Sequence, residues 1–298
     1  MIPTIGVFDS GFGGLTVLRA LVHRLPTARF AFLGDTARLP YGSKSRRTIA
    51  RYAVQSAQFL VREQRAEFLV IACNTASALA LDAIQEAVPV PVLGVIQPGA
   101  QSARAASRTG DVLVIATDAT VHSHAYAAAC QALNLRALEK ACPLLVPLVE
   151  EGWIDHPVTE QVIRIYLDDL AADAAAHGLR PDTLVLGCTH YPLLRPLIER
   201  LAPAGITVID SAESTADAAV QLVNGLNGIN DPGRPILDAP PQPSGSDPHS
   251  SGAARVGVNP AQTEIRCFAT DSVEKFERLG SRFLGRPVGK VELIDLGG

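Results

Sequence analysis

Short apolar runs alternate with longer amphipathic stretches along most of this 298-residue chain. Brief runs of Val, Ile, Leu, Phe and Ala are typical of strands that are buried on both faces of a parallel sheet. The runs predicted as strands are residues 4–10, 28–35, 67–74, 90–98, 111–117, 183–188 and 206–210. A helical period between them predicts helices at 13–25, 43–64 and 76–88.

The stretch from residue 123 through the EGW and HPV segments is predicted to be rich in helix, and the tail from residue 263 to hold a strand, a helix and a strand. Strands that are separated by helices predict an α/β fold with parallel, doubly wound sheets. The pattern restarts after residue 97, so we expect two α/β domains. The first comprises 1–97 and 209–298, and the second comprises 98–208. Residues 230–262 are dense in Pro, Gly, Ser and Asp, which predicts a flexible surface insertion.

Composition narrows the function classes. Hydrophobic residues make up 47% of the chain and charged residues 19%, and the net charge is −4. This balance shows no basic footprint for nucleic acid, and no apolar run is long enough to span a membrane. The N-terminus runs directly into a predicted strand, which leaves no room for a signal peptide. We therefore expect a cytoplasmic protein with no nucleic-acid or membrane partner.

Two of the five cysteines occupy equivalent places. Cys73 and Cys188 each end an apolar strand and precede small polar residues, whereas Cys130, Cys142 and Cys267 are expected in the core. The odd count and the strand-end positions argue against a disulfide framework. Ligands of α/β sheets bind at the carboxyl ends of strands. Two thiols are therefore expected to face one cavity, which suits a reaction that needs a base on each side of its substrate.

Other uses of these thiols are less consistent with the pattern. Cys73, Cys188 and His190 could ligate zinc, but the close ligand pairs usual at zinc sites are missing on the Cys73 side. A Cys–His hydrolase needs only one thiol. Pyridoxal phosphate needs a Schiff-base lysine, and none of the lysines follows an apolar strand; they are Lys44, Lys140, Lys275 and Lys290. We expect neither a metal nor a cofactor.

A glycine-rich turn, DSGFGGLT at 9–16, follows the first strand and opens a helix. It could bind a dinucleotide, with Asp35 as the ribose-binding acid, but its GxGG spacing departs from that fingerprint and Asp9 would repel a pyrophosphate. A plain tight turn is also possible. The favoured interpretation is that Ser10 and the backbone N–H groups receive a carboxylate, with Asp9 beside the chemistry.

Two further polar segments have less specific patterns. Residues 40–43, Pro-Tyr-Gly-Ser, form either a simple turn or part of a site for a small anion. Glu150 and Glu151 are expected to be solvated acids at a helix end. Two α/β domains around a cleft are also typical of periplasmic binding proteins, but paired strand-end thiols and the lack of a signal peptide argue against that class.

Four motifs resemble those of one enzyme family. DSGFGGLTV, GDTARLPYG, CNTASA and GCTHYPLL, in this order, are similar to segments of the cofactor-independent glutamate racemases, in the aspartate/glutamate racemase family. The similarity covers residues 4–228 and, more weakly, the segment from Thr263. It implies two α/β domains that are related by a pseudo-twofold axis, with the active site in the cleft between them.

The resemblance also implies roles for single residues. Cys73 and Cys188 would be the acid/base thiols, Cys73 acting on the D-enantiomer and Cys188 on the L-enantiomer, with Asp9 and His190 as polar partners. The positions implied to contact substrate are Ser10, Pro40, Tyr41, Gly42, Ser43, Asn74, Thr75, Thr117, Thr120 and Thr189. The implied activity is interconversion of L- and D-glutamate, which supplies D-glutamate for peptidoglycan synthesis. Aspartate racemisation on the same fold is the alternative, and we expect a homodimer.

Overall fold

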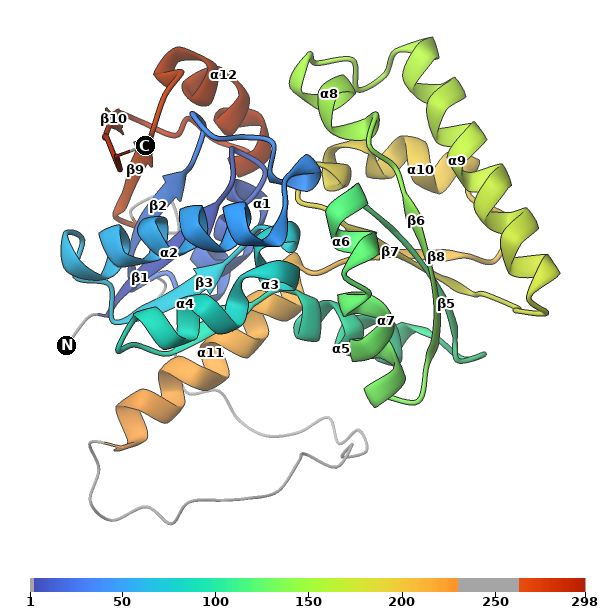
Figure 1. The fold of residues 1–298 in the computed structure, drawn as a ribbon, viewed down its shortest axis with the longest axis horizontal. Coiled ribbons are helices and arrows are strands. Elements are labelled where there is room, and N and C mark those ends of the chain that lie inside the picture. The colour runs from blue at the N-terminus through green and yellow to red at the C-terminus, as the bar shows by residue number, and fades with distance from the viewer. Residues whose placement is uncertain (1–2, 230–262, 298) are drawn as a thin grey trace, which may run out of the picture.

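Two parallel sheets, each covered by helices, make up the protein. The computed structural model describes residues 3–229 and 263–297, so the predicted insertion at 230–262 lies outside the described residues. One sheet and its helices occupy one side of the molecule, and the second sheet with its helices occupies the other (Figure 1). This arrangement confirms the predicted α/β class with two parallel sheets.

The elements that lead up to the second sheet are β1 Thr4–Asp9, α1 Leu15–Arg24, β2 Arg29–Gly34, η1 Tyr41–Ser43, α2 Arg46–Arg62, β3 Phe68–Ile71, α3 Asn74–Leu79, α4 Leu81–Ala87, β4 Val92–Gly94 and α5 Ile96–Ala106. The second sheet and its helices comprise β5 Asp111–Ala116, α6 Asp118–His122, α7 Ala125–Ala132, β6 Arg136–Ala141, α8 Leu145–Glu150, α9 Pro157–Ala176, β7 Thr183–Gly187, η2 Tyr191–Leu194, α10 Arg195–Leu201 and β8 Thr207–Asp210. The chain ends with α11 Ala212–Ile229, β9 Ile265–Ala269, α12 Val273–Leu284 and β10 Val291–Leu293.

The two sheets repeat one strand order. The first runs β10-β9-β2-β1-β3-β4 and the second β6-β5-β7-β8, with every pair parallel. In each, the earliest strand, β1 or β5, lies between the next two strands along the chain. The chain crosses from one side of that strand to the other before β3 and β7, and α/β proteins bind their ligands at such a switch point. Cys73 and Cys188 follow β3 and β7, so both thiols are placed there.

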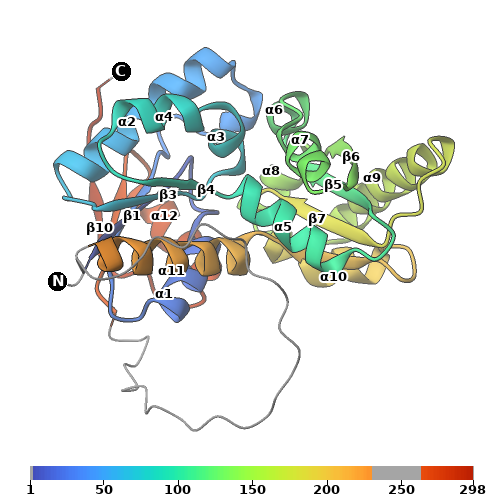
Figure 2. The same cartoon turned by 90° about the horizontal axis from the view of Figure 1, so that it is seen from below.

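Helices cover both faces of the first sheet, as doubly wound folds require. Figure 2 shows α2, α3 and α4 on one side of it and α1 and α11 on the other. β9 and β10 extend this sheet beyond β2, whereas β8 pairs with β7 in the second sheet. The domain division at 1–97 with 209–298 and at 98–208 remains our proposal. No helix among residues 3–229 and 263–297 is long and apolar enough to cross a membrane.

One strand was missed by the sequence analysis. β6, with the sequence RALEKA, lies in the stretch that was predicted to be rich in helix, and it forms the edge of the second sheet. An edge strand pairs on one side only and leaves its side chains half-exposed, so it can carry charged residues that hide the apolar strand pattern. The strand predicted at 90–98 is also shorter than expected, because α5 begins at Ile96.

The glycine-rich turn is explained by close packing. A Cβ on Gly13 would collide with Thr189, which follows β7 of the second sheet. A Cβ on Gly14 would lie 2.6 Å from Cβ of Asp9 and 2.8 Å from Cβ of Ala72. Only glycine lets the start of α1 approach these backbones so closely. The turn therefore brings Asp9 and the second half of the molecule together.

Replacing Gly14 with Ala is expected to lower the free energy of unfolding by about 1–3 kcal/mol, because the added methyl group meets two atoms that are fixed to the backbone. Urea denaturation measures this loss. The matched control is Gly225→Ala on the exposed side of α11, where a Cβ meets nothing within 4 Å and helix propensity predicts a gain of up to about 1 kcal/mol. Equal stabilities of the two variants would contradict the packing argument.

Candidate active site

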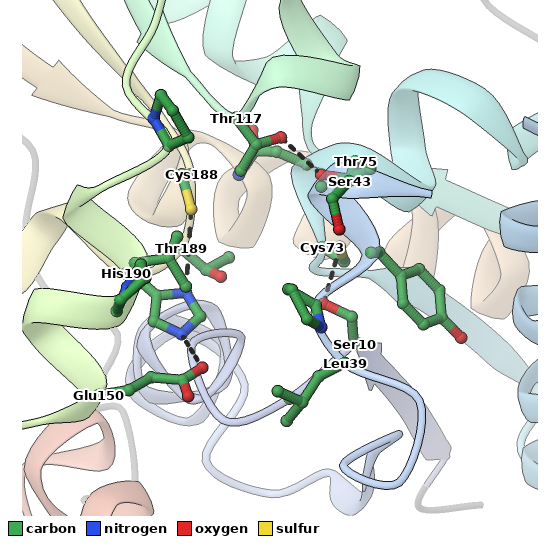
Figure 3. A pocket seen from close by; sticks show the side chains of 18 of the residues that line it. Ser10, Leu39, Ser43, Cys73, Thr75, Thr117, Glu150, Cys188, Thr189 and His190 are labelled. Carbon is green, nitrogen blue, oxygen red and sulfur yellow. Dashed lines mark hydrogen bonds and ion pairs between the residues drawn. The ribbon is translucent and has the colours of Figure 1, made fainter. Parts of the chain in front are cut away.

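A cavity of about 300 Å³ lies between the carboxyl ends of the two sheets. Both halves of the molecule line it, and Figure 3 shows their side chains converging. The first half contributes Ser10, Gly11, Leu39, Pro40, Tyr41, Gly42, Ser43, Cys73, Asn74 and Thr75. The second half contributes Thr117, Asp118, Pro143, Val146, Pro147, Glu150, Glu151, Cys188, Thr189 and His190.

All of the residues predicted for the site line this cavity except Asp9 and Thr120. These two are fully buried and contact residues of the cavity wall. Asp9 accepts hydrogen bonds from the backbone N–H of Gly11 at 2.9 Å and from the Thr189 hydroxyl at 3.4 Å. Thr120 lies 3.2 Å from the Thr75 hydroxyl. Both predicted residues therefore support the wall rather than form it.

Cys73 caps the N-terminus of α3. Its Sγ accepts a hydrogen bond from the backbone N–H of Ala76 at 3.4 Å and donates one to Ser10 Oγ at 3.4 Å (Figure 3). Burial raises the pKa of the Cys73 thiol, and the nearby Asp9 carboxylate raises it further, to about 12. Cys73 is therefore a neutral thiol at physiological pH when no substrate is bound.

Cys188 has different surroundings. Its Sγ lies 3.8 Å from Nδ1 of His190, whose Nε2 lies 3.3 Å from Oε1 of Glu150 (Figure 3). Burial acts to lower the pKa of His190, but the contacts with Cys188 and Glu150 outweigh it and raise the pKa to about 10. His190 is therefore an imidazolium at neutral pH. His190 thus places a positive charge beside the Cys188 sulfur.

The two thiols thus have different charged neighbours. Cys73 is held protonated near the Asp9 carboxylate, and Cys188 lies beside a cation. Burial also raises the pKa of Asp9, against the lowering effects of His190 and of the Gly11 backbone N–H. Two thiols that line one cavity from opposite halves, one near an anion and the other beside a cation, suit a two-base proton transfer.

Hydroxyl and amide groups complete the polar lining. The hydroxyls of Thr75 and Thr117 lie 2.9 Å apart and connect α3 to the loop before α6. Oδ1 of Asn74 accepts a hydrogen bond from the Tyr126 hydroxyl at 2.7 Å. This bond leaves the amide NH₂ of Asn74 as the group that can donate to a bound carboxylate.

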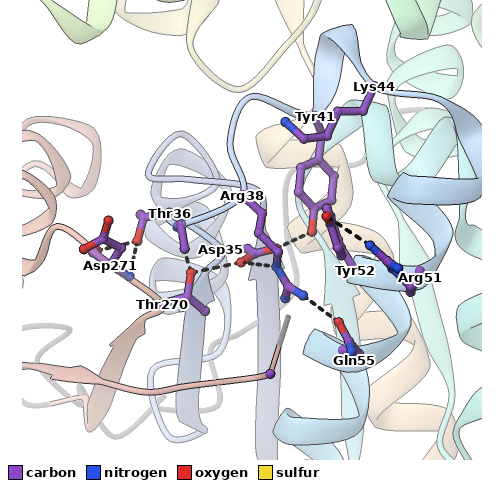
Figure 4. Close-up of polar contacts among 12 residues, drawn as sticks. Asp35, Thr36, Arg38, Tyr41, Lys44, Arg51, Tyr52, Gln55, Thr270 and Asp271 are labelled. Carbon is purple, nitrogen blue, oxygen red and sulfur yellow. Dashed lines mark hydrogen bonds and ion pairs between the residues drawn. The ribbon is translucent and has the colours of Figure 1, made fainter.

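Tyr41 contributes less than the sequence suggested. Its hydroxyl donates to Oδ2 of Asp35 at 2.5 Å (Figure 4), and Asp35 does not line the cavity. Asp35 is fully buried and also accepts hydrogen bonds from Arg38 Nε and the Thr270 hydroxyl. Donors for an anion on this loop must therefore come from Gly42 and Ser43. The same network makes Asp35 an internal anchor, which removes the basis of the dinucleotide alternative.

Glu150 is a site residue that the sequence analysis misjudged. It was expected to be a solvated acid, but its side chain is only 10% exposed and is held by His190 and by Lys275 Nζ at 3.0 Å. Burial raises the pKa of Glu150, and these two cations lower it more, so the group stays a carboxylate. No local pattern marks this role, because Lys275 lies 125 residues further along the chain.

The remaining predictions for the cysteines hold. All five are free thiols, and Cys130, Cys142 and Cys267 are buried in the core as expected. Within the described residues, no group of three or more His, Cys, Asp or Glu side chains could hold a metal ion.

Comparison with known proteins gives a consistent result. The model of the Asp/Glu/hydantoin racemase family matches residues 5–219. A glutamate racemase of Koribacter versatilis is 53% identical over 303 residues, which cover 99% of this chain and 98% of that protein. Among solved structures, a glutamate racemase isoform of Bacillus anthracis is 34% identical with a TM-score of 0.80, and the alignment covers 99% of this chain and 98% of that one.

A second solved structure shows a ligand in such a protein. The glutamate racemase of Francisella tularensis, in complex with D-glutamate, is 32% identical with a TM-score of 0.79, and the alignment covers 99% of this chain and 98% of that one. The four motifs, the paired sheets and these full-length matches agree. The chain belongs to the Asp/Glu/hydantoin racemase family, among its glutamate racemases.

Proposed function

We propose that this protein interconverts L- and D-glutamate by proton transfer at the α-carbon between Cys73 and Cys188, without a cofactor. The observation that carries the proposal is that one thiol from each half of the molecule lines a single cavity. The reaction would supply D-glutamate for peptidoglycan synthesis in the cytoplasm. From the resemblance of the four sequence motifs to those of glutamate racemases, we also expect a homodimer.

The need for two thiols follows from stereochemistry. Racemisation removes the α-proton from one face of the substrate and returns a proton to the other face. A single base cannot reach both faces of a substrate held in one orientation. In the proposed mechanism, a thiolate on one side takes the α-proton while the thiol on the other side gives up its own. The two cysteines therefore exchange protonation states in each turnover.

The carbanionic transition state has to be stabilised by the protein, because the α-proton of an amino acid is a very weak acid. Donors that are fixed before the reaction lower this barrier most effectively. Asn74 and Thr75 line the cavity and are held by Tyr126 and Thr117. Such donors act more strongly in a cavity that excludes water.

Glutamate is expected to be the preferred substrate. Its distal carboxylate reaches about one methylene further than that of aspartate, toward donors on the loop of Gly42 and Ser43. Aspartate would leave one of these donors unpaired, which costs about 1–3 kcal/mol. We predict that kcat/KM for glutamate exceeds that for aspartate at least about tenfold. Circular dichroism of each enantiomer measures both rates, and equal or reversed rates would assign the chain to aspartate racemisation.

Replacing either cysteine with Ser should abolish racemisation, because a serine hydroxyl is a far weaker acid. Elimination from a glutamate that carries chloride on the β-carbon needs only one deprotonation. Cys73→Ser and Cys188→Ser should each retain elimination from one enantiomer and lose it from the other. Release of 2-oxoglutarate measures this split. A single mutant that racemises normally would exclude the two-base mechanism.

The raised pKa of Cys73 should be detectable in the free protein, without any substrate. Cys73 has a pKa of about 12, so its thiolate fraction rises about tenfold per pH unit between about pH 7 and 9. Its rate of alkylation by iodoacetamide should rise in the same proportion, since the thiolate is the reacting form. Mass spectrometry of the modified peptide follows Cys73 alone. A rate that levels off below about pH 9 would contradict the raised pKa.

A further inference from the structure

Helix α12, from the last segment of the chain, contacts the Cys188 side of the active site at two points. Lys275 in its first turn places Nζ 3.0 Å from Oε2 of Glu150. Two turns later, the Phe283 ring packs edge-on against the His190 ring, with 5.4 Å between the ring centroids. Helix α12, which does not line the cavity, thus contacts both Glu150 and His190.

The Lys275–Glu150 ion pair connects the two halves of the molecule. α12 follows β9 of the first sheet and packs against α1 and β10, whereas α8, which ends at Glu150, follows β6 of the second sheet. α12 and α8 face each other across this junction in Figure 1. The position of a carboxylate in one half is therefore fixed by a lysine in the other.

The surroundings of this pair favour a well-defined geometry. The side chain of Lys275 is 33% exposed and that of Glu150 is 10% exposed, so salt and water screen the pair less than they would on an open surface. The ammonium group also lies 5.7 Å from the centroid of the Phe12 ring, within range of a cation–π interaction. Each oxygen of Glu150 has its own partner, Oε1 with His190 and Oε2 with Lys275. A carboxylate held at both oxygens cannot rotate freely.

We propose that Lys275 is a positioning residue for the Cys188 half of the proton-transfer pair. By holding Oε2 of Glu150, it keeps Oε1 on His190 and so keeps the imidazole ring directed at Cys188. This inference rests on the proposed racemisation for its role in turnover, but the arrangement exists in the free protein and can be tested there. Lys275 acts through Glu150 and does not line the cavity.

The first test needs no substrate. In Lys275→Met, we expect the Glu150 carboxylate to turn away and the His190 ring to lose its fixed direction. Alkylation of Cys188 by iodoacetamide should then slow by roughly tenfold, which is the scale of one lost charge-assisted hydrogen bond. Alkylation of Cys73 should stay within about twofold, because its partners are Ser10 and Ala76. Lys275→Arg should restore most of the rate. Lys290→Met removes an exposed lysine outside the cavity and serves as the matched control.

The second test asks whether Lys275 acts through Glu150. If it does, Lys275→Met should have almost no further effect on Cys188 alkylation in a protein that already carries Glu150→Gln. Additive effects would show an independent action and overturn the proposal. Faster alkylation of Cys188 in Lys275→Met would overturn the proposal as well. That result is expected if Lys275 acts only through its charge, because removing that charge would strengthen the Glu150–His190 pair.

The third test links the lysine to turnover. L- and D-glutamate have equal free energies in water, so kcat/KM for racemisation must change equally in both directions and cannot reveal which thiol is affected. Elimination from the two β-chloroglutamate enantiomers can. Lys275→Met should slow elimination by roughly tenfold only for the enantiomer that Cys188→Ser fails to process. An equal loss for both enantiomers, or no loss, would contradict a positioning role.

These readouts separate the two proposals. A wild-type protein that does not racemise glutamate would refute the proposed function, while the alkylation experiments would still decide the role of Lys275. If Lys275→Met lowers the melting temperature markedly, Lys275→Ala, which also removes the donor to Glu150 but places no long apolar side chain beside the carboxylate, provides the same comparison. A normal Cys188 alkylation rate in both variants would reject the inference.

Discussion

The ion pair between His190 and Glu150 sets the electrostatics of the active site. Water has little access to either group, so burial alone would leave the imidazole neutral. Glu150 and the Cys188 sulfur outweigh that effect and keep His190 protonated. On the opposite side of the cavity, burial and Asp9 act in the same direction and keep Cys73 protonated. Two chemically identical thiols therefore have neighbours of opposite charge.

Contacts between the two halves of the molecule gather around the same residues. Thr75 meets Thr117, Asn74 accepts from Tyr126, Asp9 accepts from Thr189, and Glu150 accepts from Lys275. Each of these pairs joins the first sheet's side to the second and includes a group in or directly behind the cavity wall. A rotation of one half against the other would therefore change donors and acid–base partners together, which is how domain closure can control turnover in enzymes of this kind.

The sequence was sufficient for features that depend on local patterns. Buried parallel strands can be predicted from apolar runs in the sequence. The positions of Cys73 and Cys188 at the ends of two such strands are enough to predict that both thiols face one cavity. Features that depend on distant partners were not visible. Glu150 looked like a solvated acid because Lys275 is remote in sequence, and the hydroxyl of Tyr41 turns inward because Asp35 is buried beside it. β6 was missed because charged residues interrupt its apolar pattern.

The repeated strand order explains why the thiols are placed symmetrically, and the C-terminal segment explains why they are not equivalent. β2-β1-β3-β4 and β6-β5-β7-β8 have the same arrangement, so Cys73 and Cys188 occupy corresponding positions. β9 and α12 are added only to the first sheet's side, yet α12 supplies Lys275 and Phe283 to the surroundings of Cys188. Because the two enantiomers have equal free energies, kcat/KM must be equal in both directions. This constraint applies to the complete catalytic cycle and not to each thiol separately. Unequal surroundings are therefore compatible with racemisation, and here they place an anion beside one thiol and a cation beside the other.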